Sequence, residues 1–168
     1  MTRLILASLL LVLALCAATT AQSQIFFVRH AEKADAGTDN KDPELSEAGR
    51  TRAESLGRMF KDAGLTAIYA TEFKRTQQTA EGVARLAHVD VTPVPAKDTD
   101  ALTARLADVK GSALIVGHSN TIPAIIKALG VSTAVALGEN DYDDLFIVVT
   151  EPEPRLVDRS MSLPLPAK

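Results

Sequence analysis

Residues 25–33 are Ile-Phe-Phe-Val-Arg-His-Ala-Glu-Lys, four apolar residues followed directly by an arginine and a histidine. A short, continuous apolar run of this kind is typical of a strand buried on both faces, as in a parallel sheet. Residues 113–120 repeat the pattern as Ala-Leu-Ile-Val-Gly-His-Ser-Asn. The two runs therefore predict two central strands, each followed by a histidine, His30 in one case and His118 in the other.

Helical and extended patterns alternate along the rest of the chain. Ser46 is suited to cap a helix, and Gly64 and Gly130 are suited to end one. We expect strands at 25–28, 67–70, 89–94, 113–116 and 145–150, with an edge strand at 155–160. We expect helices at about 46–63, 73–87, 101–109 and 121–129. This alternation predicts a three-layer α/β/α sandwich with a largely parallel central sheet.

The chain begins with a pattern typical of an export signal, which we assign to residues 1–21. Arg3 gives it a positive start, residues 4–18 are an apolar run, and Thr-Thr-Ala at 19–21 suits cleavage. The run is shorter than the about 20 apolar residues that a membrane-spanning helix needs. We therefore expect a secreted or periplasmic protein without stable membrane insertion.

Two alternatives to a cleaved signal are an uncleaved anchor and a lipid attached to Cys16. Leu15 precedes that cysteine where lipid-attachment sites usually carry a small residue, which disfavours the second alternative. After the signal, the pattern predicts one domain at 22–160 and a C-terminal tail at 161–168, without internal repeats. The sequence leaves the oligomeric state open.

Composition excludes several classes of protein. The net charge of −3 is spread along the chain without a basic block, and only 4% of the residues are aromatic. Nucleic-acid binders usually carry a concentrated basic patch, so we expect no nucleic-acid partner. The single cysteine lies within the expected signal. The exported domain would therefore have no disulfide, no thiolate nucleophile and no sulfur-ligated metal.

A third segment, residues 69–76, places Arg75 in the first turn of a helix that follows a predicted strand. The carboxyl ends of the strands line one crevice in an open α/β sheet, so Arg29, His30, Arg75 and His118 should meet there. An imidazole can attack phosphorus, and guanidinium groups bind phosphate oxygens through paired hydrogen bonds. These residues predict a site for a small phosphorylated substrate or inorganic phosphate.

Four segments together resemble the histidine phosphatase superfamily, the phosphoglycerate mutase-like group, and within it the small exported bacterial members. They are residues 28–33, 45–49, 69–80 and 116–120, which occur in this order and span most of the chain after the signal. The resemblance implies the phosphoglycerate mutase-like fold. It also implies a phosphoric monoester hydrolase that works without a metal or another cofactor.

The resemblance further implies a role for each matched residue. His30 would take up the phosphoryl group as a phosphohistidine that water then hydrolyses, and Arg29, Arg75 and His118 would bind the phosphoryl oxygens. The physics agrees, because a neutral imidazole has a free lone pair and covalent capture splits one difficult displacement into two. Fixed cations can then neutralise the phosphoryl oxygens. Asn120 and Lys33 are further candidates for substrate contact.

The chain departs from the family pattern at two places. Ala31 stands where the family usually has glycine. In larger members a glutamate after the second arginine protonates the leaving group, but the corresponding region here offers only Asp98 and Asp100. Glu72, beside Arg75, is another candidate for this general acid.

Other polar residues have a structural interpretation. His88 is expected to close a helix on the surface, and residues 141–144 to form a solvated turn that could also overhang the pocket. Glu32 and Lys33 would either line the mouth of the site or pair with each other. Ser119 lacks the second glycine of a nucleophile elbow, which argues against a serine hydrolase.

Two alternative functions remain at this point. The first is a phosphate-binding or interaction module with little turnover, suggested by the missing acid. The second is a metal-dependent hydrolase, for which two histidines and two arginines would make a poor cation site.

Overall fold

The computed structural model describes residues 23–35, 37, 40–150 and 153–160. The predicted signal and the C-terminal tail lie outside the described residues. Among the residues that are described, no helix combines the length and the apolar character needed to cross a membrane.

The central sheet has six strands in the order β3-β2-β4-β1-β5-β6. β4 pairs in parallel with β1 and β2, β2 pairs in parallel with β3, and β5 runs antiparallel to both β1 and β6. The prediction of a largely parallel sheet is confirmed, because β5 alone is reversed in the described sheet. The strands are β1 (Gln24–Arg29), β2 (Leu65–Ala70), β3 (Val91–Pro93), β4 (Ser112–Gly117), β5 (Asp144–Val149) and β6 (Arg155–Ser160).

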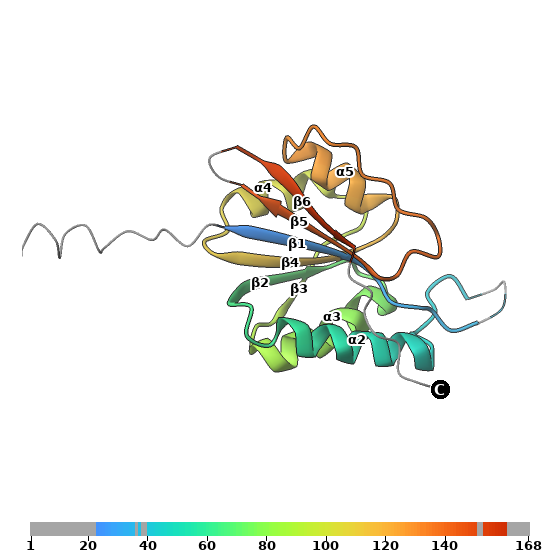
Figure 1. Ribbon diagram of the computed structural model, residues 1–168. Coiled ribbons are helices and arrows are strands. Elements are labelled where there is room, and N and C mark those ends of the chain that lie inside the picture. The colour runs from blue at the N-terminus through green and yellow to red at the C-terminus, as the bar shows by residue number, and fades with distance from the viewer. Residues whose placement is uncertain (1–22, 36, 38–39, 151–152, 161–168) are drawn as a thin grey trace, which may run out of the picture.

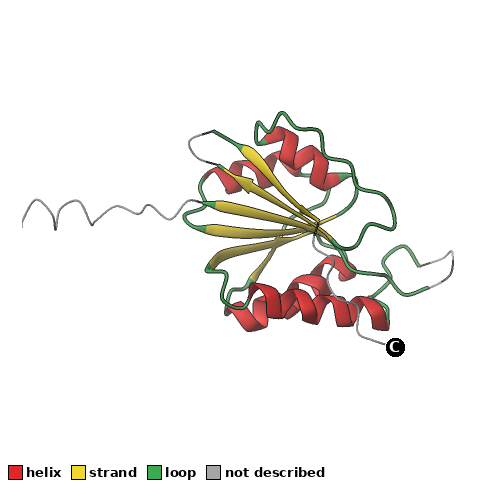
Figure 2. Cartoon of the chain, in the orientation of Figure 1, coloured by secondary structure: helices red, strands yellow, loops and turns green. Residues whose placement is uncertain are grey.

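Helices cover both faces of this sheet. Figure 1 shows α2 (Glu47–Phe60) and α3 (Lys74–Ala87) on one face, with α4 (Thr99–Ala107) and α5 (Thr121–Ala128) on the other. Figure 2 shows the same three layers, with the strands between two groups of helices. The predicted α/β/α sandwich is therefore confirmed.

The core consists of two apolar layers, because successive side chains of a strand point to opposite faces. From β1, Phe26 packs with α2 and α3, where its ring meets that of Phe60 edge-on at 5.0 Å. Phe27 is fully buried on the α4–α5 face, in the cluster that contains Ile122. Burying each such side chain contributes about 1.5–3 kcal/mol. The continuous apolar run thus holds β1 at the centre of the molecule.

The ends of several helices differ from the predicted ones by a few residues. α2 ends at Phe60, and the chain then turns through Gly64, which has a φ of +64°. α4 begins at Thr99 because the side chain of Asp98 accepts a hydrogen bond from the amide of Ala101 and caps the helix. α3 ends at the exposed, left-handed His88 (φ 58°), as predicted for this surface histidine.

Candidate active site

His30 and His118 lie side by side because β1 and β4 are parallel neighbours in register. Arg29 pairs with Gly117 at the carboxyl ends of these strands, and the amide of His30 donates to the carbonyl oxygen of Gly117 at 2.9 Å. The two imidazole rings meet edge-on with their centroids 5.2 Å apart, and both residues are buried. The parallel sheet thus brings together two residues that are 88 positions apart in the chain.

A cavity of about 470 Å³ opens at this edge of the sheet. Its size suits a small organic ligand. Four of its lining side chains are permanent cations and one is a carboxylate, so the cavity favours an anion. Its lining includes Arg29, His30, Lys33, Phe73, Arg75, Lys97, His118, Ser119, Asn120 and Glu139.

The ring of His30 is held in one tautomer. Its Nδ1 lies 2.8 Å from the carbonyl oxygen of Ala31, and a carbonyl only accepts, so Nδ1 carries the hydrogen. In the neutral ring Nε2 then has a free lone pair. Burial lowers the pKa of His30 to about 4, and the charges of Arg29 and Arg75 add to this effect. The imidazole is therefore neutral near pH 7 and can act as a nucleophile.

The ring of His118 is held by two neighbours in the segment that joins β2 to α3. Its Nε2 lies 2.9 Å from Oγ1 of Thr71, and the Phe73 ring packs edge-on against it at a centroid distance of 5.3 Å. The pKa of His118 is also lowered to about 4, mainly by burial and next by the positive charge of Arg75. This ring, too, is neutral in the free protein at physiological pH.

Arg29 is buried beneath the loop that joins α5 to β5. Its Nη1 donates to the carbonyl oxygen of Gly138 at 2.8 Å, and its Nη2 donates to Glu139 at 3.0 Å. The guanidinium also stacks on the ring of Tyr142, 4.6 Å from its centroid. Nε of Arg29 is buried without a hydrogen-bond partner in the described part of the chain.

Arg75 enters the cavity from the first turn of α3. Its guanidinium lies over the ring of Phe73, 4.4 Å from the centroid, and its Nη1 lies 3.7 Å from a carboxylate oxygen of Asp42. The same phenyl ring contacts His118, so Phe73 packs against both residues. This packing directs a permanent positive charge toward the two histidines.

The segment that follows His30 is anchored to α2 and α3. The amide of Ala31 donates to Oγ1 of Thr79 at 2.9 Å, and the Glu32 carboxylate accepts from both Nε and Nη2 of Arg52. Burial alone would raise the pKa of Glu32, but the hydrogen bonds from Arg52 lower it below its usual value. Glu32 therefore pairs with Arg52, whereas Lys33 is exposed and lines the cavity.

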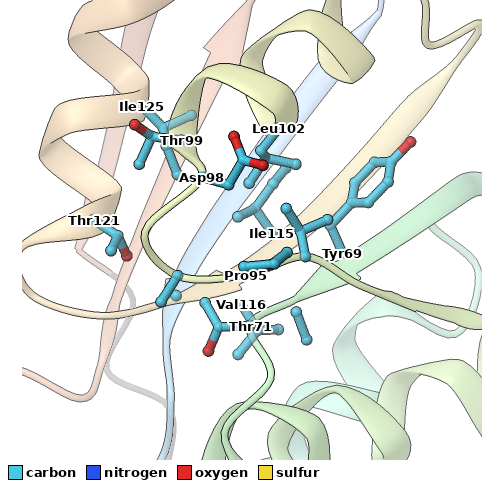
Figure 3. A pocket seen from close by; sticks show the side chains of 14 residues that line it. Tyr69, Thr71, Pro95, Asp98, Thr99, Leu102, Ile115, Val116, Thr121 and Ile125 are labelled. Carbon is cyan, nitrogen blue, oxygen red and sulfur yellow. The ribbon is translucent and has the colours of Figure 1, made fainter.

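The three residues considered as general acids, Asp98, Asp100 and Glu72, are not among the residues that line this cavity. Asp98 caps α4 and borders a separate void of only about 10 Å³, where Figure 3 shows it beside Thr99 and Leu102. Glu72 is exposed, and its carboxylate accepts a hydrogen bond from the amide of Ala96 at 2.7 Å. Asn120, proposed for substrate contact, does line the cavity that contains His30.

The sequence interpretation did not identify Glu139 or Thr71 as members of the site. Glu139 is the one carboxylate among the residues lining the His30 cavity in the described chain, and its second oxygen accepts from Ser119 at 2.6 Å. The hydrogen bond from Ser119 and the charge of Arg29 lower the pKa of Glu139, which is therefore ionised near pH 7. Nothing local in the sequence marks this loop residue, but Thr71 lies inside the 69–80 segment and could have been considered.

No group of three or more histidine, cysteine, aspartate or glutamate side chains within the described ranges is arranged to hold a metal ion. The donors around His30 are instead cations and neutral rings. The charge of such a donor set suits an anionic ligand.

A sequence model of the histidine phosphatase superfamily (branch 1) matches residues 25–98. The match includes three of the four segments on which the resemblance was based, and the fourth contains His118. The comparison with curated proteins gave no match.

Several solved structures share the fold, among them two phosphatases. The protein histidine phosphatase SixA in complex with tungstate has a TM-score of 0.68 and 16% identity, and the alignment covers 83% of this chain and 97% of that one. A mycobacterial glucosyl-3-phosphoglycerate phosphatase with inorganic phosphate gives 0.61 and 18%, with coverage of 83% and 98%. YhfR of Bacillus stearothermophilus gives 0.66 and 16%, with coverage of 83% and 97%.

At these identities the structural likeness establishes the fold. Together with the sequence match over residues 25–98, it confirms the resemblance to the histidine phosphatase superfamily that the four segments indicated.

Proposed function

We propose that this chain, which matches the histidine phosphatase superfamily in sequence and in fold, is an exported phosphatase that hydrolyses phosphomonoesters through a phosphohistidine on His30. The observation that carries the proposal is the hydrogen bond from His30 Nδ1 to the carbonyl oxygen of Ala31. It leaves the Nε2 lone pair available in a cavity lined by Arg29, Arg75 and His118.

The reaction has two displacements. The lone pair of His30 Nε2 attacks phosphorus while the bond to the leaving-group oxygen breaks, and that oxygen departs with the bonding electrons and takes a proton from water. A second water then attacks the phosphohistidine and gives a proton to the hydroxide left by the first step, the electrons of the N–P bond return to Nε2, and inorganic phosphate leaves. Arg29, Arg75 and His118 are proposed to hold the phosphoryl oxygens in both steps, with Lys33 and Asn120 at the rim.

Electrostatic stabilisation by fixed donors replaces the metal ions that many phosphoryl-transfer enzymes use. The lowered pKa of His30, about 4, supports this mechanism because the nucleophile is already deprotonated at Nε2. The proposed activity therefore needs no added divalent cation, and a chelator should leave it unchanged.

Turnover of p-nitrophenyl phosphate between about pH 4 and pH 8 tests the proposal. His30→Ala should abolish the release of p-nitrophenol, whereas His88→Asn, at an exposed histidine remote from the cavity, should not. Brief reaction and an alkaline quench should trap an acid-labile phosphate on the peptide that contains His30. Release that survives His30→Ala would refute the phosphohistidine mechanism.

The alternative is a phosphate-binding module of the same fold with little turnover. The observation that favours it is that Asp98 and Glu72 lie outside the cavity, so neither of these two acids is placed to protonate a poor leaving group there. Binding of inorganic phosphate without release of p-nitrophenol at any pH would support this alternative. An enzyme without such an acid should instead prefer substrates with good leaving groups.

Export is proposed from residues 1–21, which have the charge and hydropathy pattern of a signal. The mass of the mature protein, purified from a bacterial host, tests this proposal. Removal of the first 21 residues and recovery outside the cytoplasm are expected, and an intact N-terminus in the cytoplasm would contradict it.

A further inference from the structure

Thr71, at the end of β2, hydrogen-bonds the second histidine of the site. Its Oγ1 lies 2.9 Å from Nε2 of His118 and 2.8 Å from Oγ1 of Thr76. All three side chains are buried. The other nitrogen of the ring, Nδ1 of His118, has no hydrogen-bond partner in the part of the chain that the structure describes.

The positions of the hydrogens in this chain follow from the carbonyl at its far end. Oγ1 of Thr76 lies 2.7 Å from the carbonyl oxygen of Phe73 and 3.0 Å from that of Thr71. Two oxygens at 2.7 Å need a hydrogen between them, and a carbonyl has none to give. Thr76 therefore donates its single hydroxyl hydrogen to a backbone carbonyl.

The same argument then fixes the next two contacts. Because the hydroxyl of Thr76 already donates its hydrogen to a carbonyl, the hydrogen between the two hydroxyls comes from Thr71. Oγ1 of Thr71 can then only accept from His118, so the hydrogen of that contact is on Nε2. We infer that Thr71 is a positioning residue that holds His118 with Nε2 protonated and turns Nδ1 toward the substrate.

The two histidines of the site would then have opposite tautomers. His30 carries its hydrogen on Nδ1 and offers Nε2, whereas His118 carries its hydrogen on Nε2 and offers Nδ1. A lone pair on Nδ1 repels a phosphoryl oxygen. His118 can therefore donate to the phosphoryl group only after Nδ1 takes up a proton, a consequence that rests on the proposed function.

The balance of charges around His118 should favour protonation of its ring only when an anion is bound. Arg75 from α3 and Arg29 from β1 oppose protonation, whereas Glu72 and Glu139 favour it. The adjacent ring of His30 is itself neutral near pH 7 and adds no charge. Burial adds to the opposition, so the ring is neutral in the free protein. An oxyanion between the two arginines would offset their charge and supply an acceptor for the new N–H group.

Nitrogen-15 spectra of the histidine rings test the tautomer directly, and the chain has only three histidines to assign. Near pH 7 we expect an Nε2–H signature for His118 and an Nδ1–H signature for His30. Thr71→Val should release His118 into a mixture of tautomers, and Thr71→Ser should restore the wild-type pattern. An Nδ1–H signature for His118 in the wild-type protein would overturn the inference, even if Thr71→Val fails to fold.

Calorimetry tests the proton uptake separately. Inorganic phosphate, which is already a dianion at about pH 8, should bind with the uptake of about one proton, measured in two buffers of different ionisation enthalpy. Binding without uptake would contradict the role of Nδ1. Absence of phosphate binding would count against the proposed function, while the tautomer is decided by the spectra alone.

Discussion

Glu139 reaches in from solvent to the buried guanidinium of Arg29. Its Oε2 lies 3.0 Å from Nη2, and the side chain of Arg29 is 3% exposed while that of Glu139 is 80% exposed. In the proposed function Arg29 binds the phosphoryl group, which carries the same charge as the Glu139 carboxylate. The carboxylate and a bound oxyanion would therefore compete for the same donor.

Glu139→Gln should tighten the binding of inorganic phosphate, because the amide competes less well for Arg29. Ion pairs with an exposed partner are worth about 0.2–1 kcal/mol, so the inhibition constant should fall by a factor of about 1.4 to 5. Asp143→Asn is a matched control, since it removes one negative charge from the same loop without an ion pair to Arg29. Equal effects of the two variants would show that phosphate binding depends on the overall negative charge of the loop and not on the ion pair between Glu139 and Arg29.

Thr79→Val should impair both stability and turnover. Oγ1 of Thr79 accepts from the amide of Ala31 and donates to the carbonyl oxygen of Arg75 at 2.7 Å, so it links the segment after His30 to α3. Removal of this oxygen leaves a buried amide without a partner, which costs about 1–3 kcal/mol. Urea unfolding and the kcat for p-nitrophenyl phosphate measure the two effects.

Thr79→Ser should recover most of both losses, because it keeps the hydroxyl. Thr103→Val is the control on α4, where the hydroxyl bonds only to the backbone of its own helix. If Thr79→Val proves as stable as Thr79→Ser, the link between α3 and His30 is unimportant.

The free protein should lose stability as the pH falls from about 6.5 toward 4. The pKa values of His30 and His118 are lowered from 6.5 to about 4, so in this range the unfolded chain binds protons that the folded chain does not. Stability then rises with pH, by on the order of 3 kcal/mol for each imidazole across the window. Urea unfolding at a series of pH values measures the slope.

His30→Ala should reduce that slope by the contribution of one imidazole. His88→Asn, at the exposed end of α3, should leave it unchanged. A stability that stays flat between pH 6.5 and 4 in the wild-type protein would contradict the neutral state assigned to both buried rings.

The central strands could be predicted from the sequence because burial on both faces leaves a continuous apolar run. That rule placed His30 and His118 at the carboxyl ends of two strands, and the structure makes those strands neighbours. Arg75 could be placed because a helix start follows a strand end in the chain. These predictions depend only on local pattern and on the geometry of parallel sheets.

Contacts made by the loops could not be predicted in this way. An aspartate such as Asp98 can serve as a general acid or as a helix cap. The start of α4 at Thr99 shows that Asp98 is the cap. Glu139 lies 110 residues from Arg29, in a loop whose path depends on Gly138 and Tyr142 packing on the guanidinium. Nothing in the local sequence records such a contact.

Gly49→Ala should destabilise the protein, although alanine normally stabilises a helix by about 1 kcal/mol relative to glycine. Gly49 lies in the first turn of α2 and faces the backbone of Glu32, whose carbonyl oxygen a Cβ atom at this position would overlap. That carbonyl oxygen already accepts a hydrogen bond from the amide of Ser46 at 2.9 Å, and this bond would resist its displacement. Relief of the overlap requires α2 to move or the segment after His30 to shift, at a cost of about 1–3 kcal/mol.

Because Glu32 is two residues from His30, the kcat of Gly49→Ala should fall together with its free energy of unfolding. Ala48→Gly, at the neighbouring exposed position, should lose only the helix propensity and leave kcat unchanged. A Gly49→Ala variant more stable than the wild type would show that α2 docks on the nucleophile segment loosely enough to accept a side chain there.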